Sequence, residues 1–129
     1  ERNRVLPVLL EFNVGGEESQ SGWNASDDSR WDMFLPEVES ILGLPSLRVR
    51  GLMTMPPLGS DPEDSRRFFL RLRLVRDRLA STFPQADWRE LSMGTSADYT
   101  VAVEEGATLV RVGTAIVGAR RTKSEVETL

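Results

Sequence analysis

The feature that most constrains this chain is an alternation, repeated four times, of a short apolar run with a longer amphipathic run. Residues 5–14 are almost continuously apolar, which is typical of a strand buried on both faces of a parallel sheet. Further strands are predicted at residues 47–55, 90–93 and 108–112. Strands that alternate with helices predict a parallel sheet with right-handed crossovers. Four such units make either half of an eight-stranded barrel or a small open sheet.

The runs between the strands carry helix signals. Residues 29–42 have apolar side chains at helical spacing, and Pro36 predicts that this helix either begins near the proline or kinks there. Residues 61–81 begin with an Asp cap at Asp61 and a proline in the first turn. The predicted buried stripe of that helix is Phe68, Leu72, Val75 and Leu79, flanked by Phe69 and Leu70.

Two shorter helices are predicted after the last two strands. Ser96 with Asp98 begins one that ends at Glu105, where Gly106 follows as the C-terminal residue. Residues 115–120 open the other, and 121–129 form a tail. The long polar run at 15–29 predicts a loop.

Composition sets the class of protein. A chain of 129 residues with 40% hydrophobic and 28% charged residues predicts one soluble globular domain, residues 1–129. The absence of histidine and cysteine excludes histidine bases, thiolate nucleophiles and disulfides within this sequence. A net charge of −4 argues against a general nucleic-acid binder, and no apolar run reaches the length of a membrane span. We expect a cytoplasmic protein.

Two turns of glycine and hydroxyl residues follow the last two predicted strands. Gly94 and Ser96 lie in the first turn, and Gly113 and Thr114 lie in the second. Parallel α/β folds bind ligands in such turns, and a helix start that follows glycine suits a phosphate. The alternative is that the hydroxyl residues are only helix caps.

Arg111 is a charged residue inside an apolar strand. Such a residue points to a ligand, a carboxylate partner or solvent, and the pattern leaves these open. The acidic runs "GEES" and "SADY" match no metal-binding loop, so we interpret them as solvated loops.

A longer set of motifs carries a family resemblance. The runs "FNVGGEESQSGW", "RVRGLMTMPP" and "ELSMGTSADYTVAVEEGATLVRVGTAIVGAR" are similar to the C-terminal half of the pyridoxal-phosphate homeostasis proteins, which have the alanine racemase N-terminal-domain fold. The resemblance covers about residues 5–120 and implies a (β/α)₈ barrel of the TIM type, of which this chain would supply strands five to eight as four parallel β-α units.

The resemblance also implies a cofactor, pyridoxal 5'-phosphate (PLP), and a non-catalytic role in vitamin B6 and amino-acid homeostasis. By the family pattern, the phosphate is held by Ser96, Gly113 and Thr114. Arg111 would face the pyridine nitrogen and keep it unprotonated, which weakens the ring as an electron sink. The pocket would be lined more loosely by Met53, Ser92, Met93 and Gly94.

The sequence departs from the family pattern at three points. The lysine that bonds PLP belongs to the first strand of the barrel, and the one lysine here, Lys123, lies past the matching segment. Thr95 stands where the family commonly has methionine, and Gln20 stands where it usually has lysine. PLP binding by this chain is therefore expected to be weak and non-covalent, or absent.

The chain begins at Glu1, directly before a strand, which predicts a proteolytic remnant or a split gene product. Half a barrel exposes two sheet edges, so we expect either self-association, with two copies completing the sheet, or pairing with the missing N-terminal half. Two other functions stay open: half of a PLP-dependent amino-acid racemase, and a structural fragment with no ligand.

Overall fold

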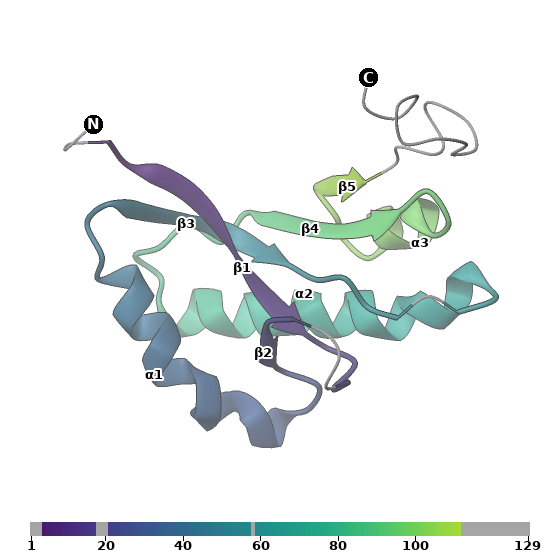
Figure 1. The fold of residues 1–129 in the computed structure, drawn as a ribbon, viewed down its shortest axis with the longest axis horizontal. Helices are drawn as coiled ribbons and strands as arrows, with labels where there is room; N and C mark the ends of the chain where they lie inside the picture. Colours follow the sequence, from purple (N-terminus) through teal and green to yellow (C-terminus); the bar gives the residue numbers. More distant parts are fainter. Residues whose placement is uncertain (1–3, 18–20, 58, 112–129) are drawn as a thin grey trace.

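The computed structural model describes residues 4–17, 21–57 and 59–111. Within these residues, five strands form one sheet in the order β2-β1-β3-β4-β5, and every neighbouring pair is parallel. Helices α1 and α2 lie together on one side of this sheet (Figure 1). The predicted α/β class with a parallel sheet is confirmed.

The strands agree with the apolar runs, with one addition. They are β1 (Leu6–Asn13), β2 (Trp23–Asn24), β3 (Leu47–Met53), β4 (Glu90–Thr95) and β5 (Leu109–Arg111). The expectation of an uninterrupted loop over 15–29 is wrong at β2, which pairs with the end of β1. The cause is aromatic packing, because the rings of Trp23 and Phe12 lie 5.4 Å apart between centroids.

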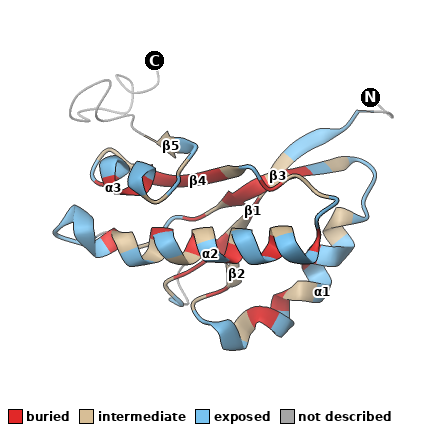
Figure 2. Ribbon diagram, turned by 180° about the vertical axis from the view of Figure 1, so that it is seen from behind, coloured by how far each residue is buried: buried red, intermediate tan, exposed pale blue. Residues whose placement is uncertain are grey.

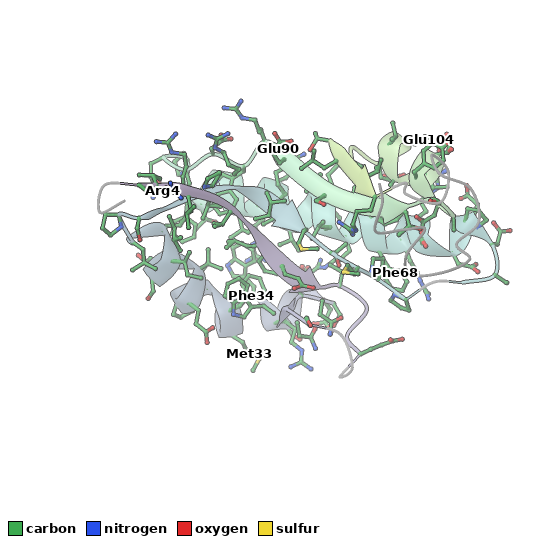
Figure 3. The ribbon with its side chains drawn as sticks, turned by 45° about the horizontal axis from the view of Figure 1, so that its top comes forward. Arg4, Met33, Phe34, Phe68, Glu90 and Glu104 are labelled. Atoms are coloured by element: carbon green, nitrogen blue, oxygen red, sulfur yellow. The ribbon has the colours of Figure 1, made fainter. Side chains whose placement is uncertain are left out.

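Helix α1 (Trp31–Leu42) follows a short 3-10 turn and runs through Pro36. The alternative that it begins near Pro36 is therefore wrong. A proline here removes the hydrogen bond to the carbonyl of Asp32. Both residues are on the exposed side of the helix, where water can take the freed carbonyl. Figure 3 shows the two sides of this helix, with Phe34 directed toward the sheet and Met33 directed away from it.

Helix α2 (Arg66–Thr82) continues from the 3-10 turn η2 (Pro62–Ser65). Asp61 begins it as predicted, since its side chain accepts from the backbone of Glu63 and Asp64 completes a capping box. The buried stripe faces the sheet (Figure 2). That stripe contains Phe69 rather than Phe68: Phe69 is fully buried, and Phe68 is only half-buried beside it.

Helix α3 (Tyr99–Glu104) is shorter than predicted. The chain leaves it through Gly106, whose φ of +104° is a left-handed conformation that favours glycine. The helix begins at Tyr99 instead of Ser96, because residues 95–98 form a separate turn that is described below. The predicted helix at 115–120 and the tail lie outside the described residues.

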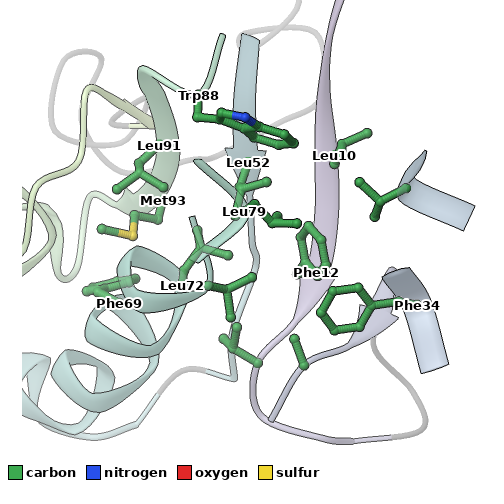
Figure 4. Packing of buried hydrophobic residues seen from close by; sticks show 14 of the residues in the cluster. Leu10, Phe12, Phe34, Leu52, Phe69, Leu72, Leu79, Trp88, Leu91 and Met93 are labelled. Carbon is green, nitrogen blue, oxygen red and sulfur yellow. The ribbon is translucent and has the colours of Figure 1, made fainter. Parts of the chain in front are cut away.

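One core joins the helices to the covered side of the sheet. Its members come from α1, α2, α3, β1, β3 and β4, and Figure 4 shows part of it. Phe12, Leu52 and Leu91 are fully buried on three neighbouring strands. Phe34 meets Phe12 edge to face, with ring centroids 5.1 Å apart. This packing fixes the sheet, and the other face of the sheet is left to carry polar side chains.

Candidate functional site

The face of the sheet opposite the core carries the residues that the sequence singled out. Successive side chains of a strand point to opposite faces. Leu52 and Leu91 are in the core, so Met53 and Ser92 point to the opposite face, where they are paired in register. We call this side the open face and define it by Glu11, Met53, Ser92 and Arg111.

Arg111 ends β5 and reaches across the open face. Its Nη1 donates to Ser92 Oγ at 2.8 Å, and its Nη2 donates to the backbone carbonyl of Thr54 at 3.1 Å. These acceptors lie on β4 and at the end of β3. Two hydrogen bonds from one planar guanidinium fix its orientation as well as its position. The sequence left open a ligand, a carboxylate partner or solvent for Arg111. Among the described residues, no carboxylate forms an ion pair with it.

Thr54 holds this arrangement together and was missed by the sequence reasoning. Its side chain is 1% exposed and donates from Oγ1 to the carbonyl of Phe12 at 2.7 Å. Its amide donates to the carbonyl of Ser92 at 3.1 Å. One residue therefore joins β1, β4 and Arg111. The only sequence signal is a threonine between two methionines in the run "LMTM".

Gly94 shapes the end of β4. Its φ of +106° is left-handed, and an added Cβ would lie 2.7 Å from the Cβ of Ala102. The glycine therefore allows α3 to pack directly against the end of the strand. The turn after β4 begins beside the end of β5, where Thr95 pairs with Arg111.

The turn at residues 95–98 is closed by its own side chains. The carboxylate of Asp98 accepts from the amide of Thr95 at 2.8 Å and from its hydroxyl at 3.3 Å. The expectation that Ser96 with Asp98 begins the helix is wrong for Ser96. Asp98 alone occupies the cap position, and its side chain makes no capping bond to α3. Ser96 is half-buried within this turn.

The remaining predicted site residues fall in two groups. Met93 is fully buried beside Phe69 in the core (Figure 4), so its side chain does not share the open face with Met53. Gly113 and Thr114, which form the second predicted phosphate turn, lie outside the described residues. Lys123 and Gln20 also lie outside them.

An ionic cluster ties α3 to the start of α2. Arg66 donates to Glu63, Glu104 and Glu105, and Arg73 also pairs with Glu105. Hydrogen bonds from Arg66 lower the pKa of the Glu63 and Glu105 carboxyls, and the three carboxylates raise the pKa of Arg66. Arg66 and Arg73 are thus engaged in structural contacts between the two helices.

A concavity in the described residues does not include Arg111 in its lining. It has a volume of about 870 Å³ and is lined by the loops after β1 and β3 and by one side of α2, including Val14, Pro57, Arg67 and Arg71. Arg71 there donates to the carbonyl of Ala25 and pairs with Asp28.

Over the described ranges, no group of acidic residues could hold a metal ion. No helix in the same residues is long and apolar enough to cross a membrane.

Comparison with known proteins identifies the family. Residues 1–121 match the family model described as "Alanine racemase, N-terminal domain". The chain belongs to this family. Over 119 residues it is 45% identical to the pyridoxal phosphate homeostasis protein of Aquifex aeolicus. The matched segment covers 92% of this chain and 49% of that protein. The resemblance stated from the motifs is confirmed.

Solved structures share the fold. An unknown protein from Bifidobacterium adolescentis has a TM-score of 0.74 at 37% identity, over 89% of this chain and 44% of that one. PipY of Synechococcus elongatus, in a structure with PLP bound, has a TM-score of 0.66 at 32% identity, over 84% of this chain and 47% of that one. The chain spans about half the length of the relatives it matches.

Proposed function

We propose that this chain supplies strands five to eight of a (β/α)₈ barrel and the phosphate and ring-nitrogen contacts of a PLP site. The proposed role is that of a PLP-binding homeostasis protein. The names of the relatives and the PLP-bound structure of PipY support the choice of cofactor.

The observation that carries the proposal is the fixed position of Arg111. A guanidinium held by Ser92 Oγ and the Thr54 carbonyl presents a cation at the carboxyl ends of three parallel strands. Ligands of parallel α/β folds bind at that end. The helices bury the other face, so the open face is the side on which a planar cofactor can reach this cation.

The described residues fit the chemistry of PLP at several points. A ring nitrogen needs a donor, which Arg111 supplies, and a phosphate needs hydroxyl and amide donors, for which we propose Ser96. Gly94 keeps the approach to that turn free of a side chain.

The lining of the open face is proposed as well. Met53 and Ser92 would line this face, and Met93 would support it from the core side. Gly113 and Thr114 remain the predicted second half of the phosphate grip.

The residue types in the chain favour binding over catalysis. When bound, PLP supplies an electron-withdrawing ring and a reactive aldehyde. An arginine at the ring nitrogen, the place proposed for Arg111, would keep that nitrogen unprotonated and weaken the ring as an electron sink. We therefore propose a carrier role. Half of an amino-acid racemase is the second candidate, favoured by the family to which the chain belongs.

The partner and location follow from the same proposal. Either the remaining half of a relative-like barrel or a second copy of this chain would cover the open face, and we propose a cytoplasmic protein without nucleic-acid or membrane partners. Light scattering at micromolar concentration tests self-association, and a clean monomer would contradict it.

A titration with PLP, followed by tryptophan fluorescence, tests the proposed function. Pyridoxal, which lacks the phosphate, is the control ligand. Saturable quenching by PLP and at least tenfold weaker quenching by pyridoxal would support it. No difference between the two would overturn the phosphate grip. Alanine racemisation above that of free PLP, on mixing with a relative's N-terminal half, would favour the racemase.

A further inference from the structure

We infer that Glu11 makes the open face selective for a ligand that carries a positive charge on the side of the ring opposite the ring nitrogen. The amine form of the cofactor, pyridoxamine 5'-phosphate, is such a ligand. This inference rests on the proposed function, because it concerns which form of vitamin B6 the same face accepts. The contacts proposed above serve the phosphate and the ring nitrogen, and Glu11 would serve the remaining end of the ligand.

Glu11 lies on the open face near the carboxyl end of β1. Its two neighbours along the strand are buried in the core, so its own side chain points to the opposite side. Glu11 is paired in register with Met53, and Met53 is paired with Ser92, whose hydroxyl oxygen accepts from Arg111. Glu11 is therefore in the same row of the sheet as the group that holds the cation.

The carboxylate of Glu11 has no cationic partner in the part of the chain that the structure describes. None of the ion pairs there includes it. The residue is already half-buried, and anything bound over the open face would remove more of it from water. A buried carboxylate is costly unless a cation or hydrogen-bond donors accompany it. A ligand on this face is therefore favoured if it brings a positive charge to Glu11.

The stem of the Glu11 side chain is packed against the backbone that enters β2. Gly22 has a φ of +97°, and a Cβ added to it would lie 2.6 Å from the carbonyl oxygen of Glu11 and 3.0 Å from its Cγ. The chain at Gly22 thus lies directly against Glu11, which restricts the rotamers of this side chain. A carboxylate on a restricted stem loses less conformational entropy when it binds a cation.

The two charges of the open face match the two ends of an aminated pyridine ring. Neighbouring strands lie about 4.8 Å apart, so the backbones at Glu11 and Ser92, two strands apart, are separated by about 10 Å. Pyridoxamine 5'-phosphate has its ring nitrogen and its amine on opposite sides of the ring, and this amine, like that of lysine, is charged at neutral pH. With the ring nitrogen at Arg111, the ammonium can extend across β3 toward Glu11. The aldehyde of PLP carries no such charge.

The test compares two ligands that differ in one group. Pyridoxine 5'-phosphate has a hydroxyl where pyridoxamine 5'-phosphate has the ammonium, and neither ligand has an aldehyde that could react with a lysine. Equilibrium dialysis of the whole chain at low ionic strength should show about fivefold tighter binding of the amine. Glu11→Gln keeps the shape of the side chain and removes its charge, so the two affinities should then agree within about twofold.

Glu90→Gln is the matched control. Glu90 is half-buried like Glu11 and lies on the same face, because Leu91 after it is in the core. It stands two residues before Ser92, which places it about 7 Å farther from the carboxyl end of the sheet. This variant should keep the fivefold preference for the amine, although its net charge equals that of Glu11→Gln.

The outcomes separate this inference from the proposed function. A parent chain that binds PLP but binds the amine and the alcohol equally would overturn the inference alone. A preference for the amine that survives Glu11→Gln, or that Glu90→Gln removes to the same extent, would also overturn it. A parent chain that binds neither PLP nor the two other ligands would overturn the proposed function, and this inference with it.

Discussion

The two faces of the sheet are built from the same strands, but one face forms the core and the other carries the candidate site. On the covered face, Leu52 and Leu91 are fully buried against the helices. On the open face, Met53 lies beside Ser92, whose hydroxyl oxygen accepts a hydrogen bond from Arg111. Each strand thus contributes alternate residues to stability and to the candidate site. Substitutions on the two faces should therefore separate the free energy of unfolding from ligand affinity.

The largest effect is expected in the covered core. Leu72→Ala removes a fully buried side chain from α2 and should lower the free energy of unfolding by about 3 kcal/mol. Urea denaturation measures this change. The control is Leu74→Ala on the same helix, where the side chain is 48% exposed and the cost should stay below about 1 kcal/mol. Equal costs would mean that α2 does not pack as described.

A smaller effect is expected where the two faces meet, at Gly94. Gly94→Ala puts a Cβ on a left-handed residue and against Ala102, and should cost about 2 kcal/mol. Thermal unfolding checks the stability, and PLP titration should show weaker binding as the turn moves. Gly43→Ala is the matched control, since the nearest atom would be 3.5 Å from its Cβ. A Gly94 variant as stable as the Gly43 variant would contradict the close approach of α3.

The ionic cluster predicts a pH dependence of about 1 kcal/mol. Hydrogen bonds from Arg66, and then from Arg73, hold the pKa of Glu105 below its ordinary value of 4.5 in the folded state. A carboxyl with a lowered pKa adds stability above its unfolded pKa and loses that contribution as pH falls through the folded one. The parent chain should therefore be about 1 kcal/mol more stable than Glu105→Gln near neutral pH.

The difference between these two chains should shrink as pH falls below 4.5 and vanish once the pH is below the lowered pKa of Glu105 in the folded state. Urea denaturation at a series of pH values measures it. Glu39→Gln, at an exposed position on α1, controls for the general effect of losing one charge. A difference that grows toward low pH would contradict the sign given above.

The smallest change in stability is expected on the open face. Ser92→Ala removes the acceptor of one Arg111 hydrogen bond, and water can replace it beside a half-buried guanidinium. The free energy of unfolding should fall by about 0.5 kcal/mol. PLP affinity should fall about fivefold, because the orientation of Arg111 is then held by the Thr54 carbonyl alone. Lower stability with unchanged PLP affinity would mean that Ser92 contributes to folding only, as the residues of the covered face do.

Local patterns in the sequence predicted much of the fold. The apolar runs marked β1, β3, β4 and β5 because burial on a parallel sheet leaves a continuous signal. The start of α2 was readable at Asp61, since a capping box is formed by residues three apart. Strand β2 was not readable, because two residues pair only where Trp23 meets Phe12 across the loop.

The site was predictable in part, for the same reason. Arg111 stood out as a charge within an apolar strand, and Gly94 stood out as a glycine at a strand end. Thr54 did not stand out, because its partners are Phe12, 42 residues earlier, and Arg111, 57 residues later. The start of α3 was not readable, because sequence spacing does not tell whether the carboxylate of Asp98 turns forward to the helix or back to Thr95.

The role of Arg111 on the open face is tested most directly by comparing the PLP affinity of the parent chain with that of Arg111→Met, by tryptophan fluorescence. Methionine keeps much of the length of the side chain and removes the cation and its donors. PLP binding should be at least tenfold weaker in this variant, with the free energy of unfolding changed by less than about 1 kcal/mol. Unchanged PLP affinity in a stably folded Arg111→Met variant would contradict the assignment of the open face as the cofactor side of the sheet.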